Sequence, residues 1–181
     1  MYHIAQQGWQ DFITITDLQD IDSKTVHTLF SDKYTLIDTL RKSTDQAVNK
    51  KIQIEEFLHA SFLDQLFELF FIRFEYLTPY KPALYSMMLH TKIDTKLLKL
   101  SLSSLKKAAE HTLSCASQSY LPRSKKNLFY LVYISLFRYW LYDTSSGYEK
   151  TQAYADELLR WWSTPKSINS VLCSLKNIFH V

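Results

Sequence analysis

Glycine, proline and cysteine are all scarce in this chain of 181 residues, which contains two glycines, four prolines and two cysteines. So few glycines and prolines leave little material for the turns of a β-rich fold or for a glycine-rich phosphate loop. The two cysteines, Cys115 and Cys173, belong to no Cys-x-x-Cys or metal-ligand pattern, which favours a reduced cytoplasmic setting over a disulfide scaffold. We expect no secretory signal, because no basic and then apolar run opens the sequence. These absences predict an all-α, cytoplasmic protein.

The composition is rich in aromatic residues and mildly basic. Aromatic side chains make up 15% of the chain, and the formal net charge is +3. This charge is compatible with nucleic acid or anionic lipid as a partner, and it implies neither of them. The length allows one domain with a substantial hydrophobic core.

The most apolar stretch is 127–143, NLFYLVYISLFRYWLYD. Read at a helical period it has no wide polar face, which is typical of a helix inside a protein or a membrane. It contains Arg138 and is shorter than the roughly 20 apolar residues that a membrane span needs. We therefore expect a central buried helix or a helix at a dimer interface.

Helical periodicity also accounts for the chain on both sides of this stretch. Long helices are expected from residue 54 to 77, from Pro82 to His90 and from Asp94, as an N-cap, to 113. The residues of the last helix that are expected to face inward are Leu97, Leu98, Leu105, Ala108, Ala109 and Leu113. Residues 145–147 break the chain, and 148–162 are expected to pack back on the central helix.

A one-sided apolar stripe is expected at the C-terminus, over residues 164–181. Its positions are Ile168, Val171, Leu172, Leu175, Ile178 and Phe179. A helix of this kind can lie in a membrane interface, although few basic residues accompany it and attraction to anionic lipid would be weak. Packing on its own domain or on a dimer partner is the alternative.

The N-terminal residues 1–48 resemble a helix-turn-helix unit, because three short helices follow one another. Polar and basic side chains that could contact phosphates and base edges occur on the second helix and at the start of the third, namely Lys24, Thr25, His27, Thr28 and Lys33. Four nearby aspartates would repel a phosphate backbone. A purely structural three-helix unit therefore remains an alternative to DNA binding.

Two histidine pairs have the spacing of metal ligands. Glu56 and His59 could share a helical face, as in di-iron bundles, but those sites need a second such pair. His111 and Cys115 are one turn apart, and two ligands do not make a structural zinc site. No nucleophile or phosphate-loop motif occurs. The sequence therefore predicts no enzyme, no metal and no cofactor.

Three short runs resemble the DNA-binding head of TetR-type transcriptional regulators: 8–11 (GWQD), 16–18 (TDL) and 26–36 (VHTLFSDKYTL). By this resemblance Phe30 is a core residue, and Lys33 meets a DNA phosphate. The segments FLDQLFELFFIRFEYLTPYKPAL and WLYDTSSGYEKTQAYADELL are similar to an alphaproteobacterial branch of that family. The run 143–146 with Thr151 is also similar to the lipid-binding accessory proteins of ubiquinone biosynthesis, which share the TetR fold.

The resemblance implies a TetR-like fold with a small head at 1–48, a helical body at 49–163 and the C-terminal helix. A homodimer would form through 124–143 and 147–162. An apolar ligand would lie among Phe67, Phe70, Phe71, Met87, Met88 and Leu105.

The chain departs from the family at its head, where the first helix is nearly absent and the spacing from Asp17 to Phe30 is short. Two functions of different class stay open, beside a third possibility, a degenerate member of the family that is retained only as a scaffold. One is a dimeric, ligand-responsive regulator with an eroded head. The other is an accessory protein that binds a quinone or isoprenoid lipid at the membrane surface and does not bind DNA.

Overall fold

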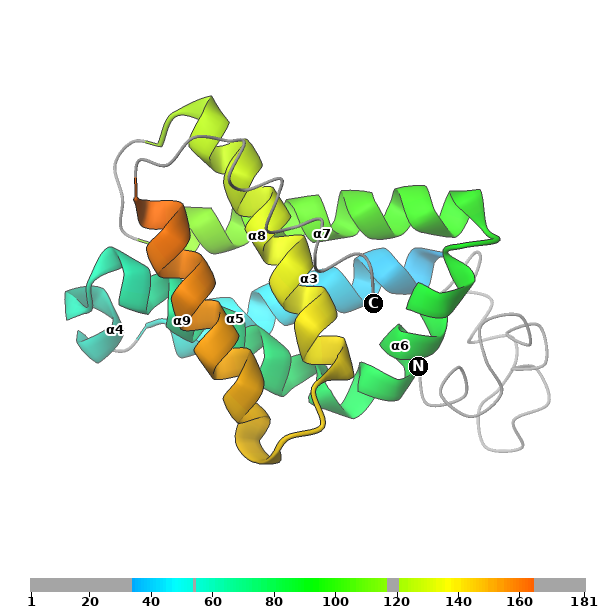
Figure 1. The fold of residues 1–181 in the computed structure, drawn as a ribbon, viewed down its shortest axis with the longest axis horizontal. Helices are drawn as coiled ribbons and strands as arrows, with labels where there is room; N and C mark the ends of the chain where they lie inside the picture. The colour runs from blue at the N-terminus through cyan, green and yellow to red at the C-terminus, as the bar shows by residue number, and fades with distance from the viewer. Residues whose placement is uncertain (1–33, 54, 117–120, 165–181) are drawn as a thin grey trace. The chain divides into compact units, whose positions relative to one another are not determined.

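Helices account for the regular secondary structure of the residues that the computed structural model describes, 34–53, 55–116 and 121–164 (Figure 1). In chain order they are α3 (Thr35–Lys51), α4 (Glu55–His59), α5 (Phe62–Leu77), η2 (Thr78–Tyr80), α6 (Lys81–His90), α7 (Thr95–Cys115), α8 (Arg123–Tyr142), η3 (Ser146–Tyr148) and α9 (Glu149–Ser163). The predicted all-α class is confirmed for these residues. Most of the predicted head and the C-terminal stripe lie outside them.

The chain divides into two compact units. Unit 1 consists of Met1–Lys50 and Arg73–Ala108, and unit 2 consists of Lys51–Ile72 and Ala109–Val181. Helices α5 and α7 each contribute residues to both units.

The core of unit 1 forms where α6 and the start of α7 meet the start of α3. Ala83, Met87 and Leu97 are buried there, and Tyr34, Leu36, Ile37 and Leu84 pack against them. The predicted signals at both helix starts are confirmed. Pro82 stands in the first turn of α6, where a missing N–H costs no helical hydrogen bond. Asp94 caps α7, because its Oδ1 accepts the N–H of Leu97 at 2.9 Å.

The inward face of α7 is narrower than the sequence predicts. Leu97, Ala108 and Ala109 are buried, and Leu105 and Leu113 are half-buried. The expectation for Leu98 is wrong, because 38% of this side chain is exposed. Successive residues of an α-helix differ by about 100° around the axis, so Leu98 stands at the edge of the face that Leu97 buries.

The helix predicted to begin at residue 54 is broken in unit 2 between α4 and α5. Ser61 caps α5, since its Oγ accepts the N–H of Asp64 at 3.3 Å and donates to the carboxylate of the same residue at 2.5 Å. Gln65, which is buried, donates from Nε2 to the carbonyl of Phe57 at 3.0 Å. The capping serine and this link fold α4 back against the start of α5.

Aromatic side chains fill the core of unit 2. Phe70 lies with its ring centroid 5.8 Å from Phe129 and 5.2 Å from Tyr133, and Phe129 also meets Trp162 edge to face at 5.2 Å. Offset and tilted ring pairs of this kind add to the stabilisation from burial alone. Helices α8 and α9 lie side by side as an antiparallel hairpin (Figure 1).

Helix α8 buries one face rather than its whole circumference. Phe129, Val132, Tyr133, Leu136 and Trp140 are buried. On the opposite side 37% of Leu131 and 49% of Tyr142 are exposed. In the single chain α8 is therefore buried on one side only.

Candidate functional site

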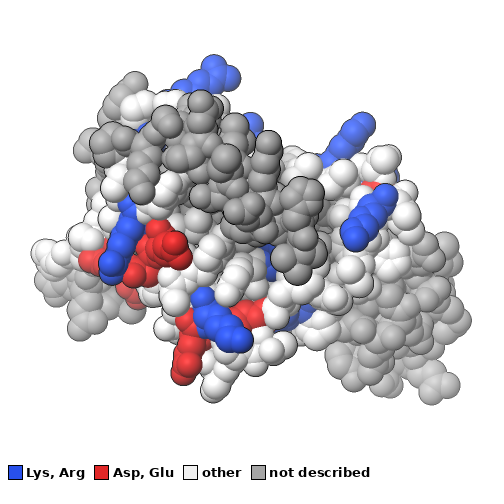
Figure 2. Space-filling view, in the orientation of Figure 1, with Lys and Arg blue, Asp and Glu red and all other residues white. Residues whose placement is uncertain are grey.

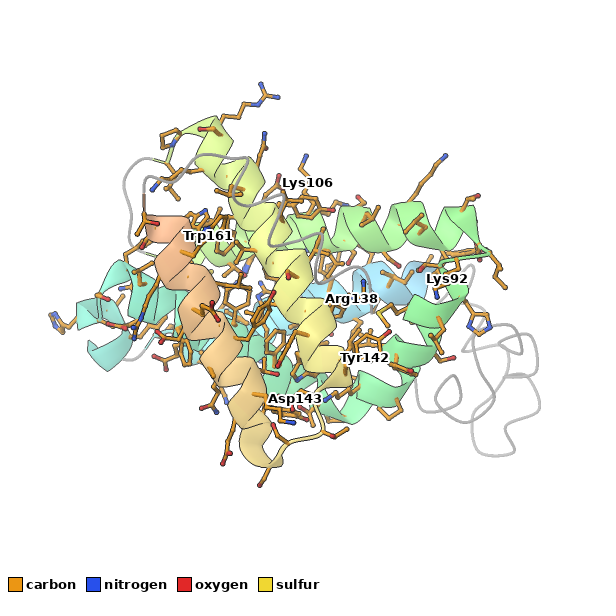
Figure 3. The ribbon with its side chains drawn as sticks, viewed as in Figure 1. Lys92, Lys106, Arg138, Tyr142, Asp143 and Trp161 are labelled. Atoms are coloured by element: carbon orange, nitrogen blue, oxygen red, sulfur yellow. The ribbon has the colours of Figure 1, made fainter. Side chains whose placement is uncertain are left out.

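Asp143 joins the end of α8 to the start of α9. Its Oδ1 accepts the N–H of Ser145 at 2.8 Å and the hydroxyl of that residue at 2.6 Å. Its Oδ2 accepts the N–H of Thr151 at 2.8 Å and the hydroxyl at 2.6 Å. Both carboxylate oxygens are thus engaged by two donors each, and the residue is 5% exposed. Figure 3 labels Asp143 at the end of α8, next to α9.

The four donors decide the protonation state of this carboxyl. Burial by itself raises the pKa of Asp143, but the hydrogen bonds from Ser145 and Thr151 outweigh burial and lower the pKa to about 2. The carboxylate therefore stays ionised. Because this carboxylate accepts the N–H of Thr151 in the first turn of α9, its negative charge also interacts favourably with the helix dipole.

The turn between the two helices places two consecutive residues in the left-handed region. Gly147 has φ 60° and Tyr148 has φ 59°. Glycine adopts this conformation without strain, whereas tyrosine rarely does. The Asp143 contacts on either side hold the backbone in this turn.

Further contacts fix the hairpin along its length. Ser135 and Tyr154 share a hydrogen bond of 2.8 Å between their hydroxyls, and the rings of Tyr139 and Tyr154 stack at 4.4 Å. At the other end Trp162 donates from Nε1 to the carbonyl of Lys125 at 3.1 Å. The hairpin is therefore held at both ends and in the middle.

The outward side of α8 is partly apolar. Leu131 and Tyr142 are exposed there, Ile134 is half-buried, and the Arg138 guanidinium lies 5.9 Å from the ring centroid of Tyr142. Arg138 and Tyr142 follow each other along α8 in Figure 3. Aromatic residues and arginine are among the residue types that protein interfaces favour.

A buried ion pair connects α3 to α5 in unit 1. Arg73 donates from Nη2 to Asp45 Oδ1 at 2.6 Å, and the Arg73 side chain is 1% exposed. Arg41 donates from Nη1 to the second oxygen of Asp45 at 2.5 Å. Because an isolated buried charge is very costly, this geometry makes the three side chains depend on one another.

The network continues from Arg41 to the surface. Arg41 donates to Asp38 at 2.8 Å and 3.1 Å, and Lys42 pairs with the other oxygen of Asp38 at 2.9 Å. Hydrogen bonds from Lys42 and then Arg41 lower the pKa of Asp38 below its ordinary value. Lys107 of α7 approaches the same carboxylate at 3.9 Å. Helix α3 is therefore tied by charge to both α5 and α7 within unit 1.

The six residues predicted to line a ligand site fall into two groups. Phe67, Phe70 and Phe71 belong to unit 2, where Phe70 is buried in the aromatic core and the rings of Phe67 and Phe71 meet at 4.7 Å. Met87, Met88 and Leu105 belong to unit 1. Met87 is part of its core, and the other two are half-buried. The ligand site remains a prediction.

The two residue pairs with metal-ligand spacing, from which the sequence predicts no metal site, can be located in part in the described chain. The Sγ of Cys115 lies 3.6 Å from Nδ1 of His111, so these two side chains do meet. His59 is exposed on the five-residue helix α4. No group of three or more His, Cys, Asp or Glu side chains among the described residues could hold a metal ion.

The predicted DNA contacts, Lys24, Thr25, His27, Thr28 and Lys33, lie outside the described residues. So do the five predicted membrane or partner positions, Ile168, Val171, Leu172, Leu175 and Phe179. Sequence reasoning missed Asp45 and Arg73. The signal that could have found them is the single arginine in the otherwise strongly apolar stretch of α5, which needs a buried acid as its partner.

No helix within the described ranges is long and apolar enough to cross a membrane. In comparisons with known proteins, no family model, no curated protein and no solved structure matches the chain.

Proposed function

We propose that this protein is a homodimeric, ligand-responsive transcriptional regulator of the TetR type with an eroded DNA-binding head. The observation that carries the proposal is the ion pair between Asp45 of α3 and Arg73 of α5. This helix follows directly on the residues expected to contact DNA, and Asp45 fixes it to the buried Arg73 of α5. Because neither charge tolerates burial alone, a displacement of α5 carries α3 with it. A regulator of this type needs such a connection, because a ligand bound in the body must change the position of the DNA-binding head.

The α8–α9 hairpin supports the dimer that a regulator of this type needs. Two copies that pair through α8 would cover Leu131 and Tyr142. The hydrogen bonds of Asp143 hold α8 and α9 together as one rigid surface. A preorganised surface loses less conformational freedom on association. The expected interface, 124–143 and 147–162, coincides with α8 and α9 to within a few residues.

The test is DNA binding at low salt, where contacts with phosphate are strongest. Fluorescence anisotropy would follow labelled duplexes from the protein's own upstream region, with Lys33→Ala as the head variant and exposed Lys99→Ala of α7 as the matched control. We expect binding that weakens steeply with salt and that Lys33→Ala weakens further. A flat titration at the lowest salt would overturn the regulator.

A lipid-binding accessory role is the second candidate, and the contacts of Asp143 favour it. The run 143–146 with Thr151 carries the resemblance to the ubiquinone accessory proteins, and three of these residues, Asp143, Ser145 and Thr151, form one hydrogen-bonded set. Residues that act together in this way make a more specific resemblance than scattered identities do. In this alternative the apolar side chains of the body would bind an isoprenoid lipid or a quinone.

Native mass spectrometry of the purified protein, with organic extraction of bound material, separates the two candidates. A dimer that carries an isoprenoid or quinone, together with a flat DNA titration, would favour the accessory role. An empty dimer that binds DNA would favour the regulator. A monomer at micromolar concentration would contradict the dimer on which the regulator depends.

A further inference from the structure

Exposed hydrophobic side chains are concentrated in one short part of unit 1. Of the nine large hydrophobic residues that are exposed in the described ranges, six lie between residues 85 and 102. They are Tyr85, Leu89, Ile93, Leu98, Leu100 and Leu102. Single exposed leucines need no explanation, whereas a local concentration of them marks an interaction surface. We name the end of α6, the turn 91–94 and the first two turns of α7 the α6–α7 corner.

Ile93 is the most exposed of these residues, with 69% of its surface open, and it lies in the turn itself. The turn is ordered by hydrogen bonds, since the N–H groups of Ile93 and Asp94 both donate to the carbonyl of His90, at 3.1 Å and 3.0 Å. Leu89, 44% exposed, stands one helical turn before Ile93. The fold therefore holds an isoleucine at the corner with a leucine beside it.

The charge around the corner has one sign. Lys92, Lys96 and Lys99 are exposed, and Asp94 is the only acidic residue between positions 85 and 109. That acid is engaged by the N–H of Leu97 and the hydroxyl of Tyr34, at 2.9 Å each. Figure 3 places Lys92 at the junction of α6 and α7, and Figure 2 shows separate blue side chains on a mostly white surface in this region.

We propose that the α6–α7 corner docks on an anionic membrane surface, with Ile93 and Leu89 entering the interfacial layer and Lys92 and Lys99 contacting lipid headgroups. Apolar side chains among lysines suit a lipid interface, because the long lysine stems extend toward the headgroups while the aliphatic groups are buried. Charge complementarity selects this occupant over a neutral surface or a second, equally basic copy of the same corner. The surface lies within unit 1 and is independent of DNA binding.

The experiment is flotation of the full chain with vesicles of phosphatidylcholine alone or of phosphatidylcholine and phosphatidylglycerol in equal parts. We expect binding only to the anionic vesicles, loss of about tenfold in partition for Ile93→Ser, and loss of about fivefold for each of Lys92→Glu and Lys99→Glu. Matched controls are Leu58→Ser, 60% exposed on α4, and the exposed Lys50→Glu of α3, which should bind like wild type.

Three outcomes would overturn the corner as the docking site. One is equal binding to both kinds of vesicle, or to neither. Another is that Ile93→Ser still binds the anionic vesicles whereas Leu172→Ser does not, which would assign the membrane contact to the C-terminal stripe. The third is self-association that Ile93→Ser abolishes, seen by sedimentation without vesicles, which would make a second copy the occupant. Unchanged melting temperatures verify that the variants fold, since every substituted corner residue is exposed.

Discussion

Asp143 and Thr151 are joined by two hydrogen bonds to the same carboxylate oxygen, one from the backbone N–H at 2.8 Å and one from the side-chain hydroxyl at 2.6 Å. Thr151 is fully buried, so neither donor can turn to water instead. The pair fixes where α9 begins relative to where α8 ends. The dimer interface proposed on α8 and α9 depends on this arrangement of the two helices.

Replacing Asp143 by asparagine should destabilise the protein. All four contacts of the carboxylate are donors, and the amide group can accept on one side only, so two donors, of Ser145 or of Thr151, would face an NH₂ group. We expect a loss of about 2 kcal/mol and a melting temperature lower by roughly 4–8 °C, measured by urea and thermal unfolding. Asp156→Asn, on the exposed pair with Arg160, is the matched control and should shift stability by less than about 0.5 kcal/mol. Equal effects of the two substitutions would contradict a stabilising role for the four hydrogen bonds of Asp143.

The same carboxylate predicts an acid limb of the stability curve. Its pKa is about 2 in the folded protein against an ordinary value of 3.8, so its contribution is complete above the ordinary value and is lost as the pH falls toward 2. The difference in unfolding free energy between wild type and Asp143→Asn should therefore shrink from about pH 4 downward. Urea titrations at a series of pH values measure it, and a difference independent of pH would show that the charge of Asp143 contributes nothing.

The pair of Asp45 and Arg73 predicts strong coupling between two substitutions. Arg73→Met removes the buried guanidinium and leaves Asp45 with Arg41 alone, at a cost of about 3 kcal/mol. Asp45→Leu should cost a similar amount, because it leaves Arg73 buried without its acid. The double variant should cost at least about 2 kcal/mol less than the sum, since an apolar pair needs no charge compensation.

Lys42→Met is the control for that cycle. Lys42 pairs with Asp38 at the surface, where its side chain is 66% exposed, and exposed pairs contribute little. Its effect on unfolding should stay within about 0.5 kcal/mol. Additive effects of the Asp45 and Arg73 substitutions would contradict the tie between α3 and α5.

Periodicity and local signals predicted most of the described helices. Pro82 and Asp94 were sufficient to locate the starts of α6 and α7, because each acts on the backbone within its own first turn. The break before Phe62 was missed, since the apolar repeat runs through it and only the capping contact of Ser61 reveals it. A capping residue at a helix start can therefore be predicted from the sequence more readily than a break inside a continuous apolar repeat.

The tertiary partners were less predictable. The sequence resemblance indicated the run 143–146 with Thr151, and only the structure shows that Asp143, Ser145 and Thr151 are the hydrogen-bonded members of this set. Asp45 and Arg73 are 28 positions apart, and no local period relates them. Leu98 shows the opposite error, because an apolar residue near a buried face was expected to be inside. Pairing across helices depends on packing angles that a single sequence does not display.

The outward face of α8 predicts the strength of the dimer. Leu131 is 37% exposed in the single chain and lies at the middle of α8, so a lysine there would bring a charge into the centre of the proposed interface. We expect Leu131→Lys to raise the dimer dissociation constant by roughly thirtyfold, which corresponds to about 2 kcal/mol. Sedimentation velocity over a concentration series measures it.

Leu58→Lys is the matched control. It is the same chemical change, and Leu58 is 60% exposed on α4, outside α8 and α9. Both variants should keep the wild-type melting temperature of the monomer, since neither side chain is part of a core. If Leu131→Lys leaves the sedimentation profile unchanged, α8 is not where two copies meet. If Leu58→Lys weakens the dimer equally, a general effect of added charge, rather than an interface at Leu131, explains both.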